Sequence, residues 1–278
     1  ALSQHIASLE EELGVALFVR SNKGMQLTEA GKTLVDHSRI VLADIERARS
    51  AVRNLGRRIS GEVVVGLPTT VALMATLPIL QAARERYPDI RLTLVESHSG
   101  FLREWLQEGR LDLSLLFQGA PDTGIEQRPM LQEQLALVTP AGQSPRARTL
   151  GLKQLADMDL MLPSKGHGLR RIIDEVCAKE NVSLRVIAEV DSLPNIKRAV
   201  QAGMASTILS PGAVCDEVKA GQLALVALNK PFISRQVTCA TSLTRPVTKP
   251  AAAMINLVTE QVKSLVLTKS WPAQWIGS

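Results

Sequence analysis

The chain has 278 residues, a formal net charge of +5 and a sequence pI near 9.3. Hydrophobic residues make up 45% of it but aromatic residues only 3%, so we expect two or three folded units with aliphatic cores. No apolar run is long enough for a membrane span, no signal peptide is recognisable, and the three cysteines lack C-x-x-C spacing. These features favour a cytoplasmic protein and argue against a disulfide scaffold or a zinc site.

The first 14 residues are predicted to form a helix that ends at Gly14. Ser3, Gln4 and His5 are polar and lie off its apolar stripe. Such side chains suit a helix in the major groove of DNA, where Gln can bond adenine and Ser or His can reach base edges or phosphates. An ordinary amphipathic surface helix would show the same pattern. The apolar residues at helical spacing are Leu2, Ile6, Leu9 and Leu13.

A short β-hairpin is predicted next, with strands near residues 17–19 and 25–27 and a tight turn between them. It carries Arg20 and Lys23 close to its tip. A basic-tipped hairpin after a helix has the form of a wing that lies on the phosphate backbone. Thr28 is predicted to cap the helix that follows.

Residues 28–58 are predicted to form one linker helix, because a heptad seam runs along them and no Gly or Pro interrupts residues 32–55. Such a helix is about 40 Å long and cannot bury its stripe alone. We therefore predict that it dimerises; packing onto its own globular body is the alternative. The seam consists of Leu34, Ser38, Val41, Ile45, Ala48, Val52 and Leu55.

The first 31 residues contain the pieces A-L-S, L-E-x-x-L-G, L-F-x-R and L-T-x-A-G. Together they resemble the second half of the winged helix-turn-helix of LysR-type transcriptional regulators, and within that family the nitrogen-assimilation-control subgroup. The resemblance implies that Ser3, Gln4 and His5 face bases and that Arg20 and Lys23 contact the DNA backbone. Family members carry further residues before this point. We therefore expect residues 1–27 to be an amino-terminally truncated, partial winged helix-turn-helix, which leaves DNA binding by these residues alone open.

From residue 62 onward, strands and helices alternate, which predicts an α/β fold with a largely parallel sheet. The polar stretch at residues 141–149 is a plausible crossing between two lobes. We therefore assign residues 62–140 to a first lobe, 141–240 to a second, 241–270 to a return to the first, and 271–278 to a tail. By resemblance to the family, these lobes form a two-lobed effector domain like a periplasmic binding protein.

In α/β sheets, ligands bind beyond the carboxyl ends of the strands. Thr69 and Thr70 follow one strand and precede a helix, so their hydroxyls favour an anion such as a carboxylate, or simply cap the helix. The loop from Ser164 to Gly168 follows another strand, and its amides could cradle an anion with help from Lys165 or His167. It is equally readable as a Gly-rich turn without a ligand, and its spacing excludes a nucleotide P-loop.

The family resemblance implies that the effector lies between the lobes. Position 68 is Pro where relatives often have a hydroxyl, which leaves the identity of the effector, and the need for one, open. The residues expected to line the cleft are Pro68, Thr69, Thr70, Phe117, Gln118, Ser164, His167 and Ser192.

No catalytic residue, metal or cofactor is predicted, because the four His are scattered and neither H-E-x-x-H nor G-x-S-x-G occurs. The sequence predicts a regulator whose promoter binding is modulated by a small, anionic effector. Expected partners are double-stranded DNA, the effector, further copies of the chain in a homodimer or homotetramer, and RNA polymerase, but no membrane. Two alternatives are a solute-binding protein built from the lobes alone and an α/β enzyme.

Overall fold

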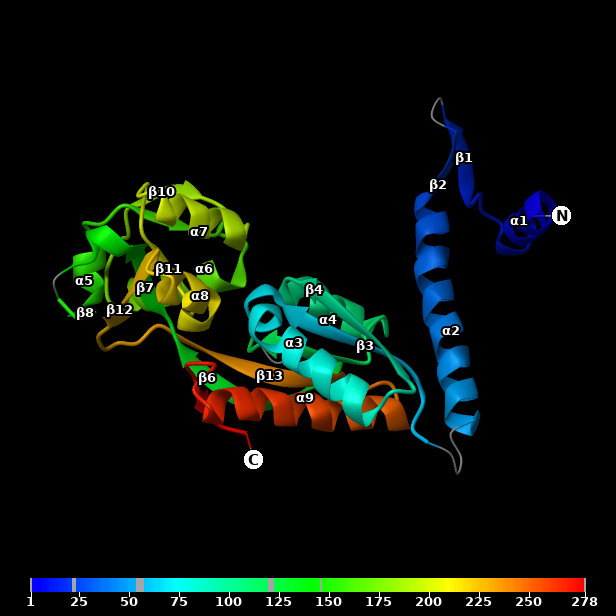
Figure 1. Ribbon diagram of the computed structural model, residues 1–278. Coiled ribbons are helices and arrows are strands. Elements are labelled where there is room, and N and C mark those ends of the chain that lie inside the picture. The colour runs from blue at the N-terminus through cyan, green and yellow to red at the C-terminus, as the bar shows by residue number, and fades with distance from the viewer. Residues whose placement is uncertain (1, 22–23, 54–57, 120–122, 146, 278) are drawn as a thin grey trace.

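A computed structural model describes residues 2–21, 24–53, 58–119, 123–145 and 147–277. Helix α1 (Leu2–Leu13) is followed by a hairpin of β1 (Phe18–Ser21) and β2 (Gly24–Leu27), then by helix α2 (Glu29–Arg53). Figure 1 shows α2 as a rod that carries the hairpin and α1 at one end and stands beside two α/β lobes. None of the described helices is both long and apolar enough to cross a membrane.

The first lobe is built on a six-stranded sheet with the order β14-β6-β13-β5-β3-β4. Strand β3 runs parallel to β4 and β5, whereas β13, β6 and β14 pair antiparallel. The sheet is therefore mixed, and the expectation of a largely parallel one is wrong for this half. Its elements are β3 (Gly61–Pro68), α3 (Thr69–Arg86), β4 (Ile90–Ser97), α4 (Ser99–Gln107), β5 (Leu113–Phe117), β6 (Ile125–Gln134), β13 (Ser234–Ser242), α9 (Lys249–Leu267) and β14 (Gln274–Trp275).

The second lobe contains a four-stranded sheet of order β11-β7-β12-β8 and a parallel pair, β10-β9. A bridge between Leu160 and Ser206 joins the pair to the end of β11. Its elements are β7 (Ala136–Pro140), η1 (Ala141–Gln143), β8 (Thr149–Leu150), α5 (Leu152–Leu155), β9 (Leu160–Leu162), α6 (Gly168–Lys179), β10 (Val186–Glu189), α7 (Leu193–Gln201), β11 (Thr207–Leu209), η2 (Pro211–Val214), α8 (Cys215–Lys219) and β12 (Leu223–Leu228).

The lobe boundaries differ from those expected. Strand β7 pairs with β11 and β12, so the chain crosses at Leu135 rather than in the polar stretch at 141–149. Strand β13 pairs with β5 and β6, so the return to the first lobe begins at residue 234 rather than 241. At the crossing itself the backbone N–H of Leu135 donates to the carbonyl of Ile233, at 2.8 Å. The polar stretch is a largely exposed surface turn, whereas Leu135 and Ile233, where the chain crosses, are buried and apolar.

Each lobe has an aliphatic core. Helices α3 and α9 cover one face of the six-stranded sheet, and α4 covers the other with Leu102 and Leu106. The second lobe buries a separate cluster that includes Leu162, Ile173 and Ile208. The predicted aliphatic character is confirmed, and Trp271, only 1% exposed, is the one aromatic side chain among the fully buried ones of the described residues.

The tail, for which the sequence assigned no structure, is docked. Gln274 and Trp275 pair antiparallel with Gln132 and Leu131 of β6, and the N–H groups of Ile276 and Gly277 donate to Met130. Strand β14 thereby covers the edge of β6, which would otherwise offer unpaired backbone groups.

Candidate DNA interface and effector cleft

Helix α1 is tied to the hairpin by a single carboxylate. Glu10 Oε1 accepts hydrogen bonds from the backbone N–H groups of Leu17 and Phe18, at 2.6 and 3.1 Å. Gly14, between them, has a φ of +68°, which favours glycine. The motif pieces L-E-x-x-L-G and L-F-x-R are thus explained by the joint between the helix and the first strand.

The motif L-T-x-A-G closes the same joint from the other side. The Thr28 hydroxyl donates to the carbonyl of Ala16 at 2.7 Å and accepts the N–H of Gly31 at 3.0 Å, so it caps α2 as predicted. A Cβ atom at residue 31 would lie 2.1 Å from the carbonyl oxygen of Leu17, so only glycine fits.

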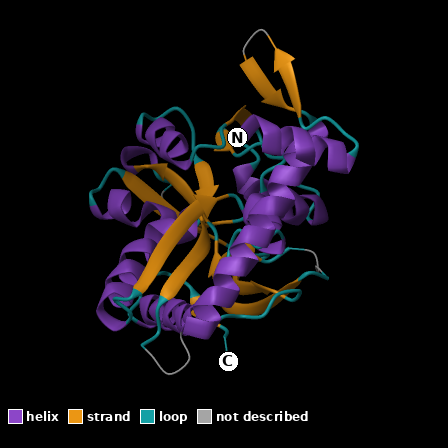
Figure 2. Cartoon of the chain, turned by 90° about the vertical axis from the view of Figure 1, so that its right-hand side faces the viewer, coloured by secondary structure: helices purple, strands orange, loops and turns teal. Residues whose placement is uncertain are grey.

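The residues expected to contact DNA lie on these elements. Ser3, Gln4 and His5 are exposed on α1, and Arg20 is exposed on β1. Lys23 lies outside the described residues. The apolar stripe of α1 is largely uncovered too, because Leu2, Leu9 and Leu13 are exposed and Ile6 is half-buried. Figure 2 shows the hairpin projecting beyond the helices at this end of the molecule.

Helix α2 is continuous and leaves its seam uncovered. Val41, Ile45 and Val52 are 56%, 44% and 69% exposed. Ser38 and Ala48 are exposed, Leu34 is half-buried, and Leu55 lies outside the described residues. The alternative that this helix packs its stripe on its own body is therefore wrong over the described part of the seam.

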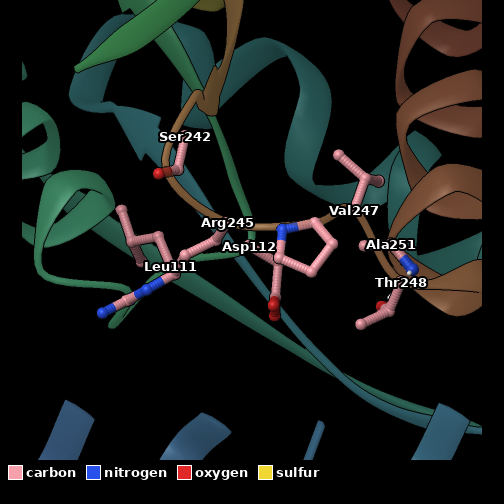
Figure 3. A pocket seen from close by; sticks show the side chains of 8 residues that line it. Leu111, Asp112, Ser242, Arg245, Val247, Thr248 and Ala251 are labelled. Atoms are coloured by element: carbon pink, nitrogen blue, oxygen red, sulfur yellow. Dashed lines mark hydrogen bonds between the residues drawn. The ribbon is translucent and has the colours of Figure 1, made fainter. Parts of the chain in front are cut away.

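The linker helix touches the first lobe through an ion pair. Arg245 Nε lies 3.7 Å from Asp44 Oδ1. The turn after α4 favours glycine at position 109, where φ is +71°, and the Arg245 guanidinium lies over this glycine. Asp112, Ser242 and Arg245 are among the residues that line a small pocket there (Figure 3). Its volume is about 20 Å³, which leaves room for one water and not for an effector.

Two predicted cleft residues meet an arginine that the sequence analysis missed. Arg235 of β13 donates from Nη2 to the Thr70 hydroxyl at 2.9 Å, and its Cζ lies 3.7 Å from the ring centroid of Phe117. Thr70 is at the start of α3, and Phe117 ends β5. The N-cap of α3 is Pro68, with no side-chain capping bond, so neither threonine hydroxyl serves as the predicted cap.

A buried carboxylate balances this arginine. Glu133 of β6 accepts from Arg235 Nε at 2.5 Å, from the Ser210 hydroxyl at 2.7 Å and from Trp271 Nε1 at 3.0 Å. The side chains of Glu133 and Arg235 are only 1% and 3% exposed. These three hydrogen bonds to Glu133 all come from residues far away in the sequence.

The second lobe contributes His167, the N-cap of α6. Its Nδ1 accepts the N–H of Leu169 at 3.1 Å, and its ring lies 5.0 Å from that of His98 in the first lobe, nearly perpendicular to it. Burial, then the nearby His98 and Arg235, hold the pKa of His167 below its ordinary value, while Asp191 opposes the shift. A neutral His167 whose Nδ1 accepts must carry its proton on Nε2.

The other predicted residues are less engaged. Ser164 donates its N–H and its hydroxyl to Asp191, at 2.9 and 3.0 Å, and these bonds hold the pKa of Asp191 below its ordinary value. Gln118 and Ser192 are exposed, and Pro68 is buried without a polar group to offer. The structure therefore brings Thr70, Phe117 and His167 into one neighbourhood around Arg235, and adds His98, which was not among the residues expected to line the cleft.

Family profiles account for both parts of the chain. The LysR substrate binding domain matches residues 56–263, and the bacterial regulatory helix-turn-helix protein of the lysR family matches residues 1–32. The chain belongs to the LysR family. This LysR-family chain is a transcriptional regulator with a DNA-binding part and an effector-binding domain, rather than a free-standing solute-binding protein.

One similar protein and two similar solved structures cover most of the chain or its effector-binding part. The nitrogen assimilation regulatory protein nac of Escherichia coli K12 is 32% identical over 272 residues, which cover 96% of this chain and 85% of that protein. A cysteine variant of full-length OxyR from Pseudomonas aeruginosa superposes with a TM-score of 0.71 at 22% identity, covering 94% of this chain and 84% of that one. The effector binding domain of QuiR in complex with shikimate has a TM-score of 0.66 at 17% identity, covering 74% and 98%.

Proposed function

We propose that this regulator recognises an anionic effector between its lobes, at Thr70, Arg235 and His167. The buried Arg235 guanidinium carries the proposal. An arginine has five N–H groups, and Glu133 and Thr70 account for two of them. Guanidinium binds carboxylates and phosphates in a planar, two-point geometry. The Nε2–H of His167 and the amino end of α3 add donors of the same kind.

Pro68, Thr69, Phe117, Gln118, Ser164 and Ser192 are proposed as the remaining lining of the cleft, because they follow strand ends that face the opposite lobe. A bound anion would shift the balance between open and closed lobes only as far as it binds one arrangement more tightly than the other. The QuiR domain with shikimate supports a small molecule as the class of ligand.

Thr70→Val is expected to lower the affinity for an anionic effector by about five-fold, since one hydrogen bond contributes about 1 kcal/mol. A panel of di- and tricarboxylates and sugar phosphates would be screened by thermal shift, and the affinity of each ligand found would be measured by calorimetry. Thr93→Val, on an exposed position of β4, is the matched control. Equal affinity in Thr70→Val and the control, or stabilisation by neutral ligands alone, would contradict the site.

On the DNA side, we propose that Ser3, Gln4 and His5 face bases and that Arg20 and Lys23 contact phosphates. Arg20→Gln is expected to weaken binding to all sequences alike and to reduce the salt slope by about one, because each phosphate contact releases about 0.9 counterion. Gln4→Ala should instead remove about 1–3 kcal/mol of the binding free energy that distinguishes one base pair, and should leave the preference at the other positions unchanged. Fluorescence anisotropy with promoter DNA over a salt series distinguishes the two; an unchanged slope in Arg20→Gln would remove the wing from the interface.

The proposed assembly is a homodimer, or a homotetramer made of such dimers, held by the seam of α2. The exposed apolar side chains along this uninterrupted helix support it. RNA polymerase is the further partner proposed for the DNA-bound state, and the cytoplasm is the compartment in which a bacterial promoter is reached. The proposed dimer contacts are Leu34, Val41, Ile45, Ala48, Val52 and Leu55.

Acid is expected to open the cleft. Because closure holds the pKa of His167 below that of an exposed histidine, the open or unfolded form binds the proton more tightly. The contribution of neutral His167 to the stability of the closed form is therefore complete above about pH 6.5, and it is lost as the pH falls through the lowered pKa of His167. A proton on His167 would face His98 and Arg235, which disfavour it, whereas Asp191 would favour it.

The measurement is the melting temperature and the radius of gyration between pH 7.5 and 5.5. His167→Asn keeps an acceptor for the Leu169 N–H and does not titrate, so its response to acid should be smaller than that of the wild type. Identical pH profiles for the two proteins would show that His167 does not control closure.

A further inference from the structure

We propose that docking of the C-terminal segment, residues 270–277, is coupled to closure of the two lobes through the carboxylate of Glu133. The coupling concerns the chain's own conformations and does not depend on which effector binds. It begins with the position of Glu133. This residue pairs with Arg235 in the β6–β13 ladder, two residues before the chain crosses at Leu135.

Three donors from three parts of the molecule converge on this carboxylate. Arg235, from the second crossing strand, takes Oε1. Ser210, from the second lobe, and Trp271, from the C-terminal segment, both donate to Oε2, at 2.7 and 3.0 Å. Ser210, Glu133 and Trp271 are all at most 2% exposed, so water cannot replace a lost bond without a rearrangement.

The two donors that share Oε2 do not belong to the same rigid part. Ser210 follows β11 and begins η2, whose residues Gly212, Ala213 and Val214 are buried. Helix η2 also touches the first lobe, because a Cβ atom at Gly212 would lie 3.4 Å from Met74 Sδ of α3. Rotation of the second lobe would carry Ser210 with it. Trp271, packed in the first-lobe core with α9, would stay.

Lobe opening therefore changes the number of donors on one oxygen from two to one. The two donor hydrogens on Oε2 carry like partial charges and repel each other, so removing the Ser210 hydroxyl strengthens the bond to the Trp271 indole. That indole anchors the segment that places β14 on the edge of β6. By linkage, whatever loosens the C-terminal segment must change the lobe equilibrium by the same free energy.

The test uses the full chain labelled with 5-fluorotryptophan, which gives one fluorine resonance each for Trp105, Trp271 and Trp275, with Trp271→Phe assigning the second. Ser210→Ala is expected to shift the Trp271 resonance and leave that of Trp105 in place. Thr207→Ala is the matched control: it also removes a buried hydroxyl from the same segment, and that hydroxyl has no hydrogen-bond partner among the residues that the structure describes.

A second measurement does not depend on the fluorine signal. The shifts in urea midpoint caused by Ser210→Ala and Trp271→Phe should be non-additive in the double variant, whereas those of Thr207→Ala and Trp271→Phe should add. A Trp271 resonance that moves no further in Ser210→Ala than in Thr207→Ala would overturn the coupling, and so would additive midpoint shifts for the first pair.

Discussion

Glu133→Gln is expected to destabilise the protein by about 3–5 kcal/mol, because it leaves the Arg235 guanidinium buried without its counter-charge. The two side chains are 1% and 3% exposed, so solvent screening cannot soften the loss. The free energy of unfolding, measured with urea at neutral pH, should show it directly. The double variant Glu133→Gln with Arg235→Met should recover much of the loss, since it leaves no unpaired charge inside.

Glu62→Gln is the control for this change. Glu62 forms an ion pair with Arg91 at 3.0 Å, and both side chains are exposed to solvent. An exposed pair contributes at most about 1 kcal/mol, so its loss should be small. If Glu133→Gln costs no more than Glu62→Gln, the buried pair is not what holds the crossing strands together.

Placing aspartate at both Val41 and Ile45 is expected to convert the proposed dimer into monomers. Each aspartate would put a charge into an apolar helix seam, at a combined cost of about 4 kcal/mol or more, which raises the dissociation constant roughly a thousand-fold. Sedimentation velocity over a concentration series measures it. Because the two helices would separate, cooperative binding to promoter DNA should be lost as well.

Arg39→Glu, on the same helix but off the seam, is the matched control and should leave the dimer intact. Circular dichroism would verify that α2 remains helical in both variants. A wild-type protein that is monomeric at micromolar concentration, or an aspartate variant that still dimerises, would rule out the seam as the interface.

Helix α1, the hairpin and helix α2 followed from the sequence because their determinants are local. Gly14 and Gly31 stand where a left-handed turn and a close backbone approach need them, and Thr28 caps the helix beside it. Strand β6 was not predicted. It contains Pro129, and its charged and apolar residues alternate only irregularly, so its sequence does not look like a strand. One of its edges is covered by a segment about 140 residues later in the chain, which no local pattern reveals.

The same distinction applies to the cleft. Thr70, Phe117 and His167 could be proposed because strand ends of an α/β sheet gather at one edge. Arg235 and Glu133 could not, since their pairing depends on two strands 102 positions apart being neighbours. An arginine within the β-branched stretch of β13 was the one available signal, and interpreting it required knowing that this strand crosses between the lobes.

The two lobe crossings are hydrogen-bonded to each other, from the Ser234–Gln134 pair through the Leu135–Ile233 bond. They therefore form a two-stranded ribbon rather than two independent tethers. A ribbon twists and bends easily but resists sliding of one strand past the other, since sliding would break its ladder. Motion of the second lobe should accordingly be a rotation about this ribbon, and both strands should show the same protection against amide exchange in the open and the closed arrangement.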